Sequence, residues 1–150
     1  MRLRSRNRRH GATTVELAVT LPIVFFLIFA IIVGALGVFR YQQTAELARE
    51  GARWACVHGG QYAEETGNSA ATATDVYNNA IKPGAAALNL TRLTYTVTWS
   101  ASNMPLDASA SYETPHGNTV SVTVNYQWFP EVYLIGPFTL SSTSTAQMIY

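Results

Sequence analysis

The sequence predicts an α+β fold in which a long N-terminal helix is followed by a small antiparallel sheet. Two observations support this prediction. A run of 23 residues without a charged side chain, Leu17–Phe39, lies near the N-terminus. Three later segments alternate large apolar with small polar residues, which is the period of a β-strand. The 111 residues after Phe39 are enough for one modest core.

The apolar run is long enough to cross a lipid bilayer. As a helix it would extend about 34 Å, compared with about 30 Å for a hydrocarbon core. Five arginines and no acidic residue precede it, whereas residues 12–150 hold five basic and nine acidic residues. A cleaved secretory signal is the alternative, but the run exceeds the usual apolar region of about 7–15 residues. We therefore expect a single membrane-spanning helix.

The arginine distribution also predicts orientation and partners. The positive-inside rule places the N-terminus in the cytoplasm and the C-terminal domain outside the cytoplasmic (inner) membrane. Because the basic arm is short and adjoins a membrane segment, we expect the lipid bilayer, and no nucleic acid, as its partner. The predicted parts are a basic cytoplasmic leader at 1–11, a transmembrane helix at 12–39 and an extracytoplasmic α+β domain at 40–150.

One carboxylate, Glu16, stands at the start of the apolar run. Thr13-x-x-Glu16 fits a capping box, with Thr13 as the N-cap residue. A second interpretation involves processing: a cut after Gly11 would leave a positive amine on Ala12, four residues from Glu16 on the same helix face. The two interpretations are compatible.

Within the apolar run, Pro22 removes a backbone donor and is expected to kink the helix one turn after its start. Ala30 and Gly34 form a small-xxx-small pair, and Gly37 follows on a nearby face. Such spacing permits a close helix–helix contact.

After the membrane, residues 40–57 are predicted to continue as a helix with a narrow apolar stripe: Tyr41, Ala45, Ala48, Ala52 and Ala55. We expect this stripe to cover the protein's own sheet, and a neighbouring subunit is the alternative. His58-Gly59-Gly60 ends the helix, 61–69 reads as a loop, and 70–82 reads as a short helix that stops at Lys82-Pro83-Gly84.

The predicted strands are 93–99, 119–128 and, more weakly, 138–149. The Ser-, Asn- and Ala-rich stretch 101–117 between the first two is expected to be a mobile loop, and the apolar bend 133–135 is expected to cap the core. The single cysteine, Cys56, is expected to pack as a small hydrophobe.

Residues with catalytic chemistry are scattered. The three histidines lie in different segments, no paired carboxylates occur at a useful spacing, and no nucleophile, phosphate-loop or zinc-protease motif is present. We therefore expect no enzyme activity, no cofactor and no metal.

The basic leader, Gly11, Glu16 and the uninterrupted apolar run together resemble a type IV prepilin signal. The stretch ELAVTLP, which places Pro22 six residues after Glu16, and the later AELAREGARWA are similar to the TadE-like family. Its members are pilin-like membrane proteins of tight-adherence (Flp) pilus systems. The resemblance covers Gly11 to about Val57.

The resemblance implies a pilin-like architecture and cleavage between Gly11 and Ala12 by a membrane prepilin peptidase. It also implies that Glu16 is the recognition and assembly residue, and that the partners are pilus-assembly membrane proteins and other pilin-like subunits. Leu17 stands where processed members often have Tyr or Phe.

Two functions are consistent with these observations. In the first, the chain is a minor pilin or pseudopilin that acts in tight-adherence pilus assembly through helix–helix contacts. In the alternative, the helix is only a tether for an extracytoplasmic binding domain. Gly11, Glu16 and Pro22 exceed what a tether needs and favour the first.

Overall fold

The structure, a computed structural model, describes residues 9–105, 117–130 and 136–149 and confirms the α+β prediction. Its elements are α1 Arg9–Val57, α2 Gly60–Thr66, α3 Ala73–Val76, the π-helix η1 Tyr77–Ile81, α4 Lys82–Gly84, the 3-10 helix η2 Leu90–Arg92, β1 Leu93–Trp99, β2 Thr119–Trp128 and β3 Phe138–Gln147. The chain forms two compact units, one ending at Leu36 and the other beginning at Gly37. Helix α1 contributes to both, and each unit is described by itself.

The first unit is the N-terminal part of α1. The helix begins at Arg9, four residues before Thr13, so the prediction that Thr13 is the N-cap residue is wrong. The backbone remains helical through Pro22. The proline removes one backbone hydrogen bond, and the other hydrogen bonds of this long helix keep it continuous. Continuous helix through an apolar segment satisfies nearly all of its own backbone groups, which a bilayer requires, and the Ala18 carbonyl opposite Pro22 is the exception.

The second unit contains a three-stranded sheet of order β1-β2-β3, with both neighbouring pairs antiparallel. Val97 lies opposite Val122, and Val122 lies opposite Ser144. The predicted alternation is confirmed on β2, where Val120, Val122 and Val124 are fully buried and the residues between them are not. Valine suits this position because its branched side chain packs well on a pleated surface.

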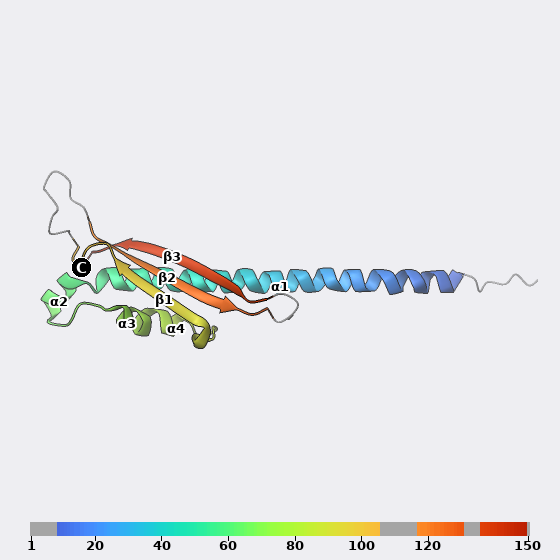
Figure 1. Cartoon of the computed structure of the whole chain (residues 1–150), viewed down its shortest axis with the longest axis horizontal. Coiled ribbons are helices and arrows are strands. Elements are labelled where there is room, and N and C mark those ends of the chain that lie inside the picture. Colours follow the sequence, from blue (N-terminus) through green and yellow to red (C-terminus); the bar gives the residue numbers. More distant parts are fainter. Residues whose placement is uncertain (1–8, 106–116, 131–135, 150) are drawn as a thin grey trace, which may run out of the picture. The chain divides into compact units, whose positions relative to one another are not determined.

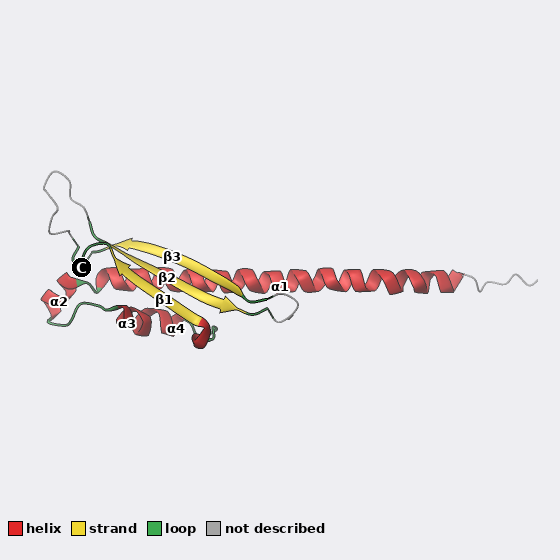
Figure 2. Cartoon of the chain, in the orientation of Figure 1, coloured by secondary structure: helices red, strands yellow, loops and turns green. Residues whose placement is uncertain are grey.

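The helical layer packs on the buried face of the sheet. Within the second unit, the three strands cross the C-terminal part of α1, and α3 and α4 run beside it (Figure 1). Figure 2 shows the same two layers by type of structure. Gly51 lies where these layers meet, because a Cβ placed on it would be 3.0 Å from Val122 Cγ1 and 3.5 Å from Val76 Cγ1.

The stripe on α1 differs in part from the prediction. Ala48, Ala52 and Ala55 are buried as predicted and Ala45 is only partly buried. Tyr41 is half exposed, so its placement on the stripe is wrong. The buried set also includes residues that the apolar pattern omitted, Thr44 and Gly51. The Thr44 hydroxyl donates to the Arg40 carbonyl at 2.9 Å, which satisfies a polar group that would otherwise be costly to bury.

The segment after α1 contains more helix than predicted. Helix α2 occupies Gly60–Thr66, where a loop was predicted, and it ends at Gly67 with φ of 71°. The next helical stretch begins at Ala73, three residues later than predicted, because Thr72 is an N-cap residue in a capping box with Asp75. It ends at Gly84, as the Lys82-Pro83-Gly84 signal indicated.

Strand β3 ends at Gln147, two residues before the predicted limit. After β3, the Met148 amide donates to the Asn118 carbonyl. The Ile149 amide donates to the Cys56 carbonyl, and this hydrogen bond joins the segment after β3 to α1. The predictions for the central part of the 101–117 loop and for the bend 133–135 fall outside the described residues.

Candidate functional site

The first unit exposes an apolar helix surface on all sides. Every side chain that the structure describes from Thr13 to Ile32 is exposed. Large aliphatic and aromatic residues make up most of this surface, and two of them, Phe25 and Phe29, stack with ring centroids 6.5 Å apart. By length and composition, helix α1 is apolar enough to cross a membrane. Apolar area of this extent requires lipid or another apolar helix around it.

The predicted processing residues lie near the start of this surface. Gly11 is exposed within α1, and outside its chain neighbours and the adjacent helix backbone no described atom lies within 4 Å of where its Cβ would be. Ala12 is helical, and its side chain falls outside the described part. Leu17 is exposed, as is Glu16. Gly11, Glu16 and Leu17 are therefore all exposed near the start of this surface.

Glu16 is the acidic residue of the apolar segment. Its side chain forms no ion pair with a side chain that the structure describes, while its backbone carbonyl accepts a hydrogen bond of 2.8 Å from the Thr20 hydroxyl. A carboxylate is costly near the middle of a bilayer and less costly near its interface. A cationic group close to Glu16 would therefore be strongly favoured inside a membrane.

Pro22 creates a second polar group on the apolar surface. Since proline has no amide hydrogen, it cannot donate to the Ala18 carbonyl, its usual partner four residues earlier. A membrane helix normally regains such a bond through a neighbouring helix or a local adjustment. Glu16 and the Ala18 carbonyl are thus two polar positions within the first turns of an otherwise apolar surface.

The small residues of the helix separate into two groups. Gly34 has open space where a Cβ would be, and Ala30 is exposed one turn before it, so this face is free to contact another helix. Gly37 belongs to the second unit, where a Cβ would lie 2.9 Å from Cζ3 of the Trp128 ring. The sequence pattern grouped Gly37 with the other two because the distant Trp128 gives no local signal.

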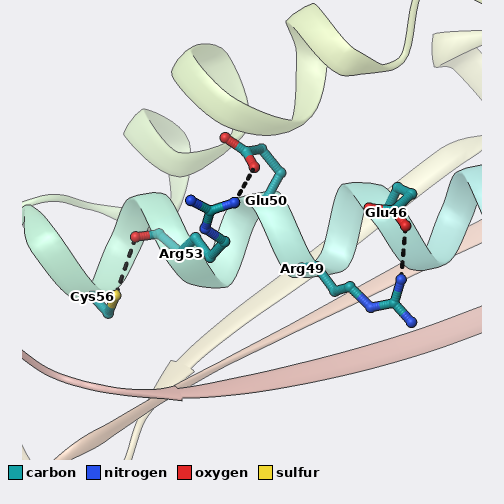
Figure 3. Close-up of polar contacts among 5 residues, drawn as sticks. All are labelled: Glu46, Arg49, Glu50, Arg53 and Cys56. Carbon is teal, nitrogen blue, oxygen red and sulfur yellow. Dashed lines mark hydrogen bonds and ion pairs between the residues drawn. The ribbon is translucent and has the colours of Figure 1, made fainter.

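In the second unit, the outward side of α1 carries two ion pairs. Arg49 lies 2.7 Å from Glu46, and Arg53 lies 3.9 Å from Glu50, as the i, i+3 spacing predicts (Figure 3). All four side chains are mostly exposed, so these pairs add little stability.

Cys56 lies about one turn beyond Arg53 on α1, and its side chain is buried. Its thiol donates to the Arg53 carbonyl at 3.1 Å, and burial raises the pKa of the thiol. Cys56 therefore packs as predicted, as a small buried hydrophobe.

Sequence reasoning missed one feature of this region. Trp54 stacks on His58, and the Tyr62 ring contacts His58 at a tilt of 59°, across the end of α1 and the start of α2. Their spacing of four residues was visible in the sequence, but the glycines after His58 indicated an end of helix rather than a continuation.

The comparisons with known proteins bear on the N-terminal part of the chain. Residues 11–53 match the model of the TadE-like protein family, in agreement with the resemblance found in the sequence. The match includes Gly11, Glu16, Pro22 and the helical segment up to Arg53. No curated protein and no solved structure matched the chain.

Proposed function

We propose that this chain, a TadE-like protein over residues 11–53, is a minor pilin or pseudopilin that acts in tight-adherence pilus assembly through its membrane helix. The family match supports a role connected with Tad pili. The observation on which the proposal depends is the exposed apolar surface of α1, which contains one carboxylate near its start and an open small-residue face further along.

In this proposal the helix crosses the inner membrane with the arginine-rich leader in the cytoplasm. The arginine count before and after the apolar run supports that orientation. The domain at 40–150 is then extracytoplasmic. Its lack of a disulfide is consistent with a core of buried valines and alanines that is stable without one.

Processing between Gly11 and Ala12 would change the role of Glu16. The cut requires local unwinding near the start of α1, which is inexpensive because the first amides of a helix have no intrahelical acceptor and helix ends fray. The new amine on Ala12 would be the cation that Glu16 lacks among the described side chains. In a neighbouring copy, the same carboxylate could pair with the amine across two helices and set their register.

Three variants of the full-length protein test this proposal. In a host with the matching peptidase, intact mass should show the wild type beginning at Ala12 and Gly11→Ala beginning at Met1. Glu16→Gln should insert in the membrane but reduce assembled pili by at least about tenfold, because an unpaired amine would cost more than about 1.4 kcal/mol. Glu46→Gln is the matched control, since Glu46 is an exposed carboxylate on the same helix in the second unit. Equal piliation by Glu16→Gln and wild type would contradict the proposal.

A helix replacement separates assembly from tethering. Residues 12–36 are exchanged for an unrelated membrane helix, and Gly37 is kept because it packs against Trp128. Loss of pili with the second unit still folded supports the assembly role. Normal function after the exchange would instead show that the helix is only a tether.

A further inference from the structure

Exposed aromatic rings lie at the end of the second unit where α1 enters it. A Cβ on Gly37 would lie 2.9 Å from Cζ3 of Trp128, and the centroids of the Trp128 and Phe138 rings are 6.1 Å apart. Phe138 is 44% exposed, and Phe39, two residues after Gly37, is 52% exposed. We call this end the base of the second unit, and it consists of residues 37–40, Leu90–Arg92, 128–129 and Phe138.

Two arginines also belong to the base. The guanidinium carbon of Arg92 is 4.3 Å from the centroid of the Phe129 ring, and its side chain forms no ion pair or hydrogen bond with a described residue. Such stacking holds the guanidinium plane in place, while its N–H groups stay available as donors. Arg40 Nη1 donates to Gln43 Oε1 at 3.1 Å and to the Ala87 carbonyl. Neither arginine pairs with a carboxylate in the described part of the chain, so both cations of the base are unneutralised there.

The base lies at the depth of the lipid headgroups when α1 crosses a bilayer. The uncharged run ends at Phe39, and its length of about 34 Å exceeds a hydrocarbon core of about 30 Å by roughly 2 Å on each side. Gly37 is about 3 Å from the end of this run along the helix axis, which places it close to the boundary between hydrocarbon and headgroups. Side chains that pack beside Gly37 lie at the same boundary, as Trp128 and its ring partner Phe138 do.

The chemistry of the base matches this boundary. Phenylalanine and leucine side chains insert readily where headgroups meet acyl chains. A guanidinium group binds phosphate through paired N–H donors, and phosphate is the anion that phospholipids supply at this depth. A macromolecule from solution would have to displace the headgroups to reach the same residues. Phospholipid is therefore the occupant that fits the base.

We infer that the base of the second unit docks on the headgroup layer of the membrane, with Phe39 and Phe138 inserted at its boundary and Arg92 bound to lipid phosphate. This inference rests on the membrane crossing of α1, which the proposed function also uses. It goes beyond the assembly role, which depends on Glu16 and on the small-residue face of the first unit. Glu16→Gln should dock like the wild type, so loss of one property leaves the other measurable.

A fluorescent label at position 138 tests the docking in the full-length protein, reconstituted as one copy per nanodisc of equal parts phosphatidylcholine and phosphatidylglycerol. Cys56→Ala removes the single native thiol, and Phe138→Cys then carries a nitrobenzoxadiazole label. Thr145→Cys is the matched control, because it is an exposed residue of β3 about 23 Å further along the strand. The label at 138 should emit at a shorter wavelength than the label at 145. It should also be quenched by lipids that carry a nitroxide near the headgroup end of the acyl chain.

Charge variants test the phosphate contact. The ratio of quenched to unquenched label at 138 reports docked against undocked protein. Arg92→Gln should lower this ratio about fivefold, as expected for one basic residue at an anionic surface. Arg92→Lys should lower it less, because lysine keeps the charge and loses only the paired donors. Arg53→Gln is the matched control and should leave the ratio unchanged, because Arg53 is an exposed arginine about 20 Å along α1 from Arg40.

Three results would overturn the inference. The labels at 138 and 145 could respond alike, which would show that the base does not contact lipid. Arg92→Gln could give the same ratio as the wild type, which would remove the phosphate contact. The label at 138 could be shielded only when two copies share a nanodisc, which would assign the base to a second copy of the chain.

Discussion

Gly51 is the position where the contact between α1 and the sheet can be tested most directly. In Gly51→Ala the new Cβ would lie 3.0 Å from Val122 Cγ1, 3.4 Å from Ile81 Cγ1 and 3.5 Å from Val76 Cγ1. All three neighbours are fully buried, so they have little room to move. Overpacking of a core costs about 1–3 kcal/mol, whereas alanine gains about 1 kcal/mol over glycine inside a helix.

The expected net result is a loss of about 1 kcal/mol in the free energy of unfolding for Gly51→Ala. Gly51→Leu adds more carbon atoms to the same space and should lose about 3 kcal/mol. Urea unfolding of the full-length protein in detergent, followed by tryptophan fluorescence, measures both. Gly34→Ala is the control, because it gains the same helix propensity where the new Cβ would meet no described atom within 4 Å beyond its chain neighbours and the adjacent helix backbone. If both Gly51 variants were as stable as wild type, the described packing of α1 on the sheet would be refuted.

Three further outcomes are expected. The pKa of Asp75 is lower in the folded than in the unfolded state, so the stabilisation from Thr72 is complete above about pH 4 and is lost as the pH falls through the folded-state pKa. Amide exchange in α3 should therefore become faster in acid, and Asp75→Asn should remove this dependence on pH. An exchange profile that Asp75→Asn leaves unchanged would contradict the prediction. Cys56 should react with iodoacetamide at pH 8 much more slowly in the folded protein than in urea, because it is buried with a raised pKa; equal rates would show that the thiol is accessible. Asn118→Ala should lower the free energy of unfolding by about 1–3 kcal/mol, because the buried amide donates to Ser102 Oγ at 3.0 Å; a loss below about 0.5 kcal/mol in urea unfolding would argue against that network.

Much of the fold could be predicted because it depends on local patterns. Strands β1 and β2 have the predicted bounds, since strict alternation over seven and ten residues is a strong signal for a sheet with one buried face. The long apolar helix, its continuation to Val57 and its outward ion pairs likewise follow from spacing along one element. The predicted end at Val57 was correct, and the helix predicted to end at Lys82 ends two residues later, at Gly84, because glycine and proline act on the backbone directly.

The errors concern helix starts and short helices. Thr13 and Glu16 match the sequence pattern of a capping box, yet α1 starts at Arg9. The residues from Arg9 to Ala12 also adopt helical backbone, so the pattern did not mark the first turn. Thr72 forms such a box with Asp75, an aspartate at the third position rather than the expected Glu or Gln. Helix α2 was missed because its polar seven residues have no apolar stripe and no buried member.

The sequence alone was enough to establish an exposed membrane-type helix with Glu16 at its start, because hydropathy, charge and spacing are properties of consecutive residues. It was also enough to predict which face of β2 is buried. Tertiary structure was needed to show that Gly37 lies against Trp128, 91 residues later, and that Arg92 lies over the Phe129 ring. Those contacts join elements that are far apart in the chain, so their geometry follows from how the helical layer packs on the sheet, and no local pattern encodes it.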